Sequence, residues 1–235
     1  MFENVRIILW DVDGTLLDFQ KAEVHAIRKG FERLHFGECT DEMLRQYSAI
    51  NAEYWRRLAY GEFTKKEILV RRFRDFFTMY GIDPEYAETF NENYQPDLGD
   101  FAFYVNGAEE TVEAFRGKKL QFAATNGTIT AARKKLKLSG LSELLDGVFI
   151  SDELGYEKPS IAYFDRVFED IRKNYGDFTP DEVVIVGDNP ASDIQGGDVA
   201  GIHTIWFNPE GKKNDTPFRV DAEIKALPEL LDLLD

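Results

Sequence analysis

The sequence predicts an α/β fold, a Rossmann-like parallel sheet with helices on both faces, into which an all-α segment is inserted. The apolar run Val5–Trp10 ends abruptly at polar residues, which predicts a buried strand. Residues 19–93 then carry apolar side chains at helical spacing, with no credible strand. From residue 106 onward, short apolar runs alternate with helical patterns, and this order favours a parallel sheet covered on both faces.

The first strand belongs to the same sheet as the later strands, so the helical segment interrupts the α/β domain. We expect a core domain from residues 1–18 and 100–235, and a helical domain from residues 19–99. Thr64 and Glu67 form a capping-box pattern that predicts a helix start. The expected helices cover residues 19–36, 40–61, 64–81 and 83 to about 93, followed by a connector over residues 94–104. Their packing core is expected to hold Tyr47, Tyr54, Trp55, Phe73, Phe76 and Phe77.

The second part of the chain predicts four more strands and the helices between them. The strands are expected at residues 120–125, 148–151, 183–187 and 203–207. The helices are expected at residues 108–116, 128–138, 161–175 and 190–200. A polar loop over residues 208–217 and a short closing helix over residues 227–235 complete the prediction.

The composition limits the classes of partner. The net charge of -15 argues against binding nucleic acid or an anionic membrane over a broad surface. No apolar run approaches the length of a membrane span, and the first residues lack the pattern of a signal peptide. The single cysteine, Cys39, cannot form an intrachain disulfide, so a reducing, cytoplasmic setting is expected.

Two carboxylates follow the first strand, at the edge of a parallel sheet where ligands bind. Asp11 ends the apolar run, and Asp13, Gly14 and Thr15 come directly after it. Two like charges about 4 Å apart cost on the order of 4 kcal/mol at an effective dielectric constant near 20, and a divalent cation is the usual compensation. Gly14 allows a tight turn that brings backbone N–H groups to an anion. An ordinary polar Asp-Gly turn is the alternative.

Polar groups also follow two later strands. Thr125, Asn126 and Gly127 stand before a predicted helix, where they form either an anion site or a helix N-cap. Asp188 ends an apolar strand as Asp11 does, and Asp193 falls in the first turn of the next helix. Asp193 could instead only compensate the helix dipole. Lys158, which precedes Pro159, is by itself a weak signal, because such lysines are usually solvated.

Together these residues resemble the haloacid dehalogenase-like (HAD) phosphohydrolase superfamily, in which four loop motifs meet at strand ends. The resemblance covers about residues 7–207, and the helical insert is similar to that family's cap of the first type, C1. The four motifs correspond here to Asp11-Val12-Asp13-Gly14-Thr15, Thr125, Lys158-Pro159, and Gly187-Asp188 through Asp193.

The resemblance implies a mechanism and a cofactor. Asp11 would be the nucleophile that forms an aspartyl-phosphate, and Asp13 would be the general acid and then the general base. Mg²⁺ would be held by Asp11, the backbone carbonyl of Asp13, and Asp188. Asp193, with Asn189 beside it, would orient Lys158 or a water on the ion. The transferring phosphoryl group would be held by Thr125, Asn126, Gly127 and Lys158.

The sequence also separates relatives within the superfamily. Dehalogenases lack the second acid of the first motif, whereas Asp13 is present here. P-type ATPases need transmembrane segments, and phosphonate hydrolases need an activated cap lysine that nothing marks in this chain. The segment DVDGTLLDF, with Thr125-Asn126-Gly127, looks most like the bacterial pyrimidine 5′-nucleotidase branch.

We therefore expect a Mg²⁺-dependent phosphatase that acts on a small phosphorylated metabolite, with a nucleoside 5′-monophosphate favoured. A sugar-phosphate phosphatase or a phosphomutase is the nearest alternative, and a non-catalytic phosphate-binding module is a further one. The protein is expected to be a monomer or homodimer. Hinges for cap closure are expected near Asp18–Phe19 and residues 99–104.

Overall fold

The computed structural model describes residues 2–214 and 216–234, so the predicted loop 208–217, the closing helix 227–235 and the outer domain limits each include a residue outside this range. The predicted α/β fold is confirmed. A six-stranded parallel sheet has the order β3-β2-β1-β4-β5-β6, which places β1 between β2 and β4. The strands are β1 (Ile7–Trp10), β2 (Leu120–Thr125), β3 (Gly147–Ile150), β4 (Val183–Gly187), β5 (His203–Phe207) and β6 (Ala222–Ile224).

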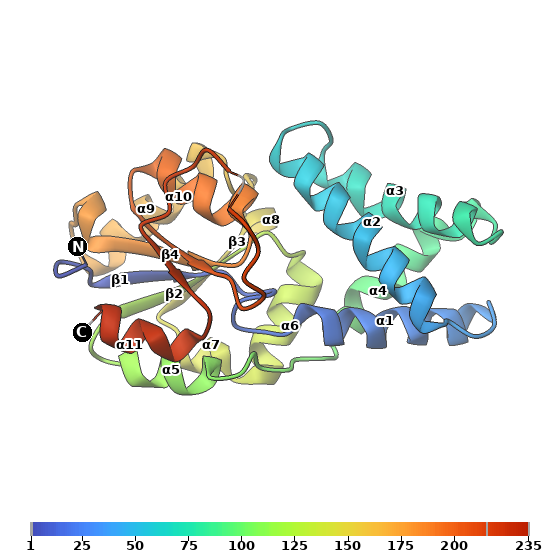
Figure 1. Cartoon of the computed structure of the whole chain (residues 1–235), viewed down its shortest axis with the longest axis horizontal. Helices are drawn as coiled ribbons and strands as arrows, with labels where there is room; N and C mark the ends of the chain where they lie inside the picture. Colours follow the sequence, from blue (N-terminus) through green and yellow to red (C-terminus); the bar gives the residue numbers. More distant parts are fainter. Residues whose placement is uncertain (1, 215, 235) are drawn as a thin grey trace.

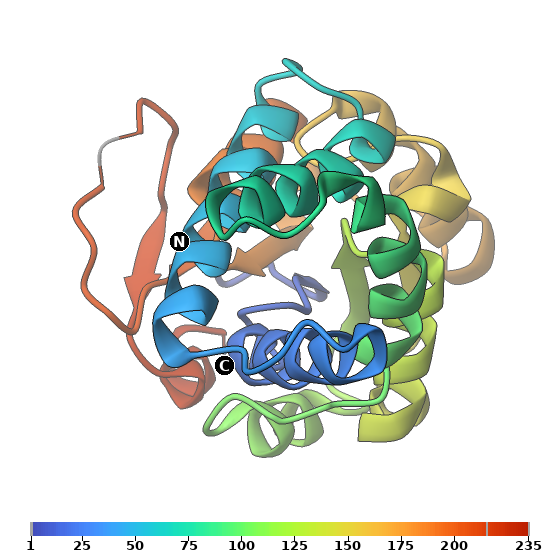
Figure 2. The same ribbon diagram turned by 90° about the vertical axis from the view of Figure 1, so that its right-hand side faces the viewer.

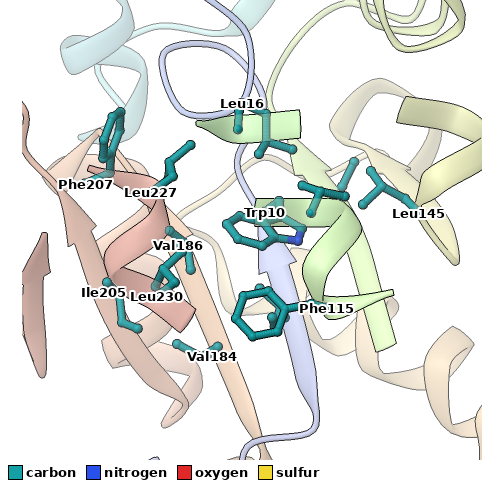
Figure 3. Packing of buried hydrophobic residues seen from close by; sticks show 14 of the residues in the cluster. Trp10, Leu16, Phe115, Leu145, Val184, Val186, Ile205, Phe207, Leu227 and Leu230 are labelled. Carbon is teal, nitrogen blue, oxygen red and sulfur yellow. The ribbon is translucent and has the colours of Figure 1, made fainter. Parts of the chain in front are cut away.

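Helices cover both faces of the sheet. Successive side chains of β1 point to opposite faces, so every residue of this strand is buried. Ile8 and Trp10 pack with Phe115 and Leu230 on one face, and Ile7 and Leu9 pack with the helix α9 on the other. Figure 3 shows Trp10 among Leu16, Phe115 and Val186. The helices of this α/β part are α5 (Ala108–Phe115), α6 (Ile129–Ser139), α7 (Leu141–Leu144), α8 (Ser151–Leu154), α9 (Ile161–Tyr175), α10 (Gln195–Ala200) and α11 (Leu230–Leu234).

The inserted segment is all-helical, and we call it the cap. It consists of α1 (Phe19–Leu34), α2 (Asp41–Ala59), α3 (Lys65–Met79), a short 3-10 turn (Pro84–Tyr86) and α4 (Ala87–Leu98). The cap stands beside the α/β core, and its helices lie in front of the sheet when the molecule is viewed from that side (Figures 1 and 2). Its own aromatic core includes the buried rings of Tyr47, Phe73, Phe76, Phe77, Phe90 and Tyr94.

The capping box predicted at the start of α3 is confirmed, since the Thr64 side chain accepts from the Glu67 N–H and the Glu67 carboxylate accepts from the Thr64 N–H. The predicted connector beginning at residue 94 is wrong. α4 continues to Leu98 despite Pro96, because Tyr94 and Leu98 are buried and their packing offsets the missing hydrogen bond.

The helix predicted from residue 128 is confirmed as α6, and Thr128 caps it by accepting from the Ala131 N–H. The alternative of an N-cap at Thr125 or Asn126 is therefore wrong. The helix predicted at residues 190–200 begins as a π-helical turn, Pro190–Ile194, before α10. β6 was not predicted, because it is only three residues long and follows the polar loop.

Two neighbouring linkers join the cap to the core. The outgoing linker pairs with the returning one through a bridge between Leu17 and Tyr104. The Asp18 N–H donates to the Phe103 carbonyl at 2.7 Å, and the Val105 N–H donates to the Leu16 carbonyl at 3.0 Å. The domain limits at residues 18/19 and 99/100 stay a prediction. No helix of the described residues is long and apolar enough to cross a membrane.

Candidate active site

The candidate site lies at the carboxyl ends of β1 and β4, two neighbours in the sheet. Asp11 follows β1 and Asp188 follows β4, so the parallel register brings them together. Carboxylate oxygens of Asp11, Asp188 and Asp193 all lie within 4.8 Å of one another. Three acids that are far apart in the sequence therefore form one cluster.

Lys158 supplies the buried positive charge of this cluster. Its Nζ donates to Asp11 Oδ1 at 2.9 Å, to Asp193 Oδ1 at 2.6 Å and to the Ala124 carbonyl at 2.5 Å. Burial alone would lower the pKa of Lys158, but the charges of Asp11 and Asp193 outweigh it and raise the pKa well above its ordinary value. Lys158 is therefore a fixed cation beside the predicted nucleophile.

Asn126 holds the segment that carries Lys158. Asn126 Nδ2 donates to the Lys158 carbonyl at 2.8 Å, and the Lys158 N–H donates to Asn126 Oδ1 at 2.9 Å. Both polar atoms of the Asn126 side chain are thus engaged with this backbone. Contact between that side chain and a phosphate stays a prediction, while its positioning of Lys158 is seen directly.

Two glycines allow the acids to come this close. A Cβ on Gly14, which has a φ of 97°, would lie 2.5 Å from Asp188 Oδ2. A Cβ on Gly187 would lie 2.3 Å from Asp193 Cγ. Any side chain at either position would displace a carboxylate of the cluster, which explains why glycine stands next to an acid in both motifs.

Asp13 meets a partner that the sequence analysis missed. Its carboxylate forms an ion pair with Lys135 of α6, whose side chain is almost completely buried. The Lys135 ammonium also lies 5.5 Å from the centre of the Phe19 ring. Lys135 falls on the buried stripe of its helix beside Ala131, Ala132 and Leu136. A lysine in such an apolar stripe is the signal in the sequence that could have indicated a buried partner for an acid.

The second motif forms a compact loop below the cavity. Thr125 is buried, and its Oγ1 accepts from the Gly127 N–H at 3.0 Å. A Cβ on Gly127 would lie 3.5 Å from Asp13 Oδ2, so this loop also packs close to the second acid. Because the Thr125 oxygen already accepts a hydrogen bond, its hydroxyl hydrogen can donate to a substrate oxygen.

The acids have the chemistry of a magnesium site. Burial raises the pKa of Asp11 to about 7, and the charge of Asp193 adds to this while Lys158 opposes it. Burial and the charge of Asp11 also raise the pKa of Asp188 well above its ordinary value. The Asp193 carboxylate is already occupied by Lys158 and by the Asn189 N–H. Asp11 and Asp188 therefore offer hard oxygen ligands whose charge a cation would stabilise, and the donor set fits Mg²⁺.

All predicted site residues line one cavity of about 790 Å³, a volume typical of small-molecule sites. The cap contributes lining side chains that include Phe19, Glu23, Asn51 and Trp55. The core contributes Asp11, Asp13, Thr125, Asn126, Gly127, Lys158, Asp188, Asn189 and Asp193. The structure thus brings together every residue singled out by the motifs, while their chemical roles stay predictions.

This fold and this acidic site belong to a known class. Residues 8–207 match the model of the haloacid dehalogenase-like hydrolase family, and the chain belongs to that family. Among its relatives, the HAD-hydrolase YfnB of Bacillus subtilis is 34% identical over 99% of this chain and 97% of its own length. A crystal structure of YfnB bound to magnesium, described as revealing interdomain movement, has a TM-score of 0.91 and covers 98% of this chain and 99% of that one, at 33% identity.

Two further relatives carry a named activity. The pyrimidine 5′-nucleotidase PynA of Streptococcus pneumoniae is 29% identical over 98% of this chain and 95% of its own length. The pyrimidine 5′-nucleotidase YjjG of Escherichia coli is 27% identical over 97% and 96%, respectively. The resemblance to the HAD superfamily near its 5′-nucleotidase branch is therefore confirmed, and the chain is a phosphatase of that superfamily.

Proposed function

We propose that this phosphatase is a Mg²⁺-dependent phosphomonoester hydrolase that uses Asp11 as its nucleophile and favours a nucleoside 5′-monophosphate. One observation carries the proposal. The Asp11 carboxylate borders the cavity, fixed by Lys158 at 2.9 Å and by the Thr15 hydroxyl at 3.1 Å, with Asp188 beside it. A carboxylate held in one orientation and paired with a cation is suited to attack phosphorus.

The residues divide the reaction into two displacements. An Asp11 oxygen bonds to phosphorus as the ester oxygen leaves, and Asp13 gives that oxygen a proton. A water then attacks the phosphorus of the aspartyl-phosphate and passes a proton to Asp13, which frees inorganic phosphate and regenerates Asp11. The ion pair with Lys135 holds the Asp13 carboxyl group in position for these proton transfers.

Groups on two sides of the phosphoryl oxygens would stabilise their negative charge. On the protein side, Lys158 contributes its positive charge, because its three N–H donors are engaged by Asp11, Asp193 and the Ala124 carbonyl. The Thr125 hydroxyl contributes a hydrogen-bond donor. Mg²⁺, held by Asp11, the Asp13 carbonyl and Asp188, would neutralise phosphoryl charge when it is bound. Asp193 keeps Lys158 in place at 2.6 Å and is not needed as a ligand itself.

The substrate proposal has its own support. PynA and YjjG carry pyrimidine 5′-nucleotidase in their names, and both align over nearly the whole chain. The aromatic side chains that line the cavity include Phe19 and Trp55 of the cap, against which a base can pack. Tyr47, in contrast, is buried within the cap. A cytoplasmic location and a monomeric or homodimeric state are part of the proposal, the former because Cys39 is the only cysteine.

A substrate panel with one variant tests this function. We expect the wild-type protein with Mg²⁺ to release inorganic phosphate from mononucleotides faster than from sugar phosphates. Asp11→Asn should lower kcat more than about a thousandfold, because the amide is a poor nucleophile. The matched control is Asp165→Asn, an exposed site on α9. Unchanged turnover in Asp11→Asn would exclude the mechanism, and isomerisation without phosphate release would indicate a phosphomutase.

A further inference from the structure

A buried carboxylate faces the active-site cavity from the cap, away from the phosphate-binding motifs. Glu23 lies on α1 and is 2% exposed, yet it lines the same cavity as Asp11 and Lys158. The motifs give it no role, and its burial needs an explanation because an acid is rarely buried without a partner of opposite charge.

Neutral groups, rather than a cation, hold the Glu23 carboxylate. Asn51 Nδ2 donates to Oε1 at 2.8 Å, and the Ser48 hydroxyl donates to Oε2. Arg72 is buried behind them and donates to Asn51 Oδ1 at 2.7 Å. It forms no ion pair with Glu23 within the described residues, although its charge opposes part of the rise that burial causes in the pKa of Glu23. Within the described part of the chain, Glu23 forms no ion pair with a lysine, arginine or histidine.

This carboxylate still has room for a donor. An ionised carboxylate can accept about four hydrogen bonds, and the protein provides one to each oxygen. Burial raises the pKa of Glu23 to about 7, which shows that its charge is poorly stabilised where it stands. A substrate N–H or O–H that entered the cavity would supply the missing stabilisation.

The charges near Glu23 disfavour an anionic leaving group. Among the described residues, Lys21 is the one lysine that the cap contributes to the cavity lining, and it is paired with Asp18 at 2.9 Å. The other lining lysines belong to the core, where Lys158 is shared between Asp11 and Asp193, Lys212 pairs with Glu210, and Lys225 lines the cavity as well. A second phosphate or a carboxylate on the leaving group would therefore meet Glu23 without a dedicated cation on the cap side.

From this arrangement we infer that Glu23 is a specificity-determining residue, which accepts a hydrogen bond from a neutral leaving group and rejects leaving groups that carry a second negative charge. The inference rests on the proposed phosphomonoester hydrolysis at Asp11 and narrows its substrates to esters such as nucleoside monophosphates. Ser48 and Asn51 position the Glu23 carboxylate, and Phe19 and Trp55 provide apolar surface for the rest of the group.

Three substrates and one variant test the inference. The kcat/KM values are measured with Mg²⁺ for uridine 5′-monophosphate, for p-nitrophenyl phosphate, whose leaving group lacks a donor, and for 2-phosphoglycolate, whose leaving group is anionic. In Glu23→Gln, the ratio of uridine monophosphate to p-nitrophenyl phosphate should fall about tenfold, chiefly through KM. The ratio of 2-phosphoglycolate to p-nitrophenyl phosphate should rise several-fold in the same variant.

Controls separate this inference from the proposed function. Glu32→Gln, an exposed site on the same helix, should leave both ratios as in the wild type. Ser48→Ala, which removes one positioning donor, should shift both ratios in the same direction by a smaller factor. Ratios in Glu23→Gln within twofold of the wild-type values would overturn the inference while leaving the hydrolase intact.

Loss of all turnover is a separate outcome. If the wild-type protein hydrolyses none of the three esters, the proposed function fails, and calorimetric binding of uridine still tests Glu23. We expect Glu23→Gln to weaken uridine binding about tenfold. Equal affinity in the two proteins, both folded by circular dichroism, would overturn the role of Glu23.

Discussion

At the scale of single residues, the absence of a Cβ atom controls the geometry of the acidic cluster. Gly187 leaves space for the Asp193 carboxylate. That carboxylate in turn accepts a hydrogen bond from Lys158 Nζ at 2.6 Å. Lys158 then holds Asp11. The position of Asp11, the proposed nucleophile, thus depends on Gly187, which is not among the residues that line the cavity.

Gly187→Ala tests this dependence. The added Cβ would lie 2.3 Å from Asp193 Cγ, so Asp193 must move and Lys158 loses its anchor. We expect a loss of about 1–3 kcal/mol in the free energy of unfolding and a fall of at least about tenfold in kcat, measured by denaturant unfolding and steady-state kinetics. Gly37→Ala is the control, because a Cβ there meets nothing within 4 Å. It should lose only about 1 kcal/mol through its positive φ and keep its kcat. Full activity in Gly187→Ala would contradict the argument.

At the scale of elements, a buried lysine at the start of α3 connects the cap to the core. Lys65 Nζ donates to the Gly127 carbonyl at 3.0 Å and to Ser151 Oγ at 2.9 Å, and it also pairs with Asp152. Gly127 belongs to the loop predicted to hold phosphate. This contact therefore ties the position of a cap helix directly to the phosphate-binding loop.

Lys65→Met should weaken the closed arrangement of cap and core. Asp152 would lose its cation and the Gly127 carbonyl would lose a donor. We expect KM for the preferred phosphate ester to rise about tenfold or more, since removal of a buried charged partner costs at least about 2 kcal/mol. Small-angle scattering should show a larger radius of gyration. Lys66→Met, at the exposed neighbouring position, should change neither quantity. An unchanged KM and radius in Lys65→Met would show that the contact does not hold the cap.

At the scale of the whole molecule, the raised carboxyl pKa values of the site predict a link between Mg²⁺ binding and the free energy of unfolding. A raised carboxyl pKa means that the folded state binds a proton more tightly than the unfolded state does. The contribution of Asp11 to the free energy of unfolding is therefore full at low pH, and it is lost as pH rises from its ordinary value of 3.8 through about 7. Mg²⁺ binds the ionised form, so it should compensate where the proton is lost.

Thermal unfolding with EDTA or with Mg²⁺ tests this linkage. The rise in Tm on adding Mg²⁺ should grow between about pH 5 and about pH 8. At a hundredfold excess over Kd, it should correspond to about 2–3 kcal/mol in the free energy of unfolding. Asp188→Asn should abolish most of the rise, because it removes a predicted ligand. The exposed Asp165→Asn should keep it. A rise that stays constant with pH, or that survives Asp188→Asn, would argue against the predicted ligands.

Sequence patterns predicted the fold and the motif residues because both depend on local rules. An acid directly after a strand, such as Asp188 after Val183–Gly187, lies at the carboxyl-end edge of a parallel sheet, where ligands bind. Lys65, Lys135 and Glu23 escaped the analysis because their roles depend on how helices pack against one another. A short strand such as Ala222–Ile224 is fixed by pairing with β5, which its own three residues cannot indicate.

The paired linkers at Leu17 and Tyr104 mean that the chain leaves and re-enters the core at adjacent points. A segment attached in this way can be lengthened, shortened or exchanged without rethreading the sheet that carries the catalytic acids. A different cap can therefore replace the present one during evolution without a change at the acidic site. If the proposed function holds, a new substrate would then require changes in the inserted segment alone, while the acids at the strand ends stay in place.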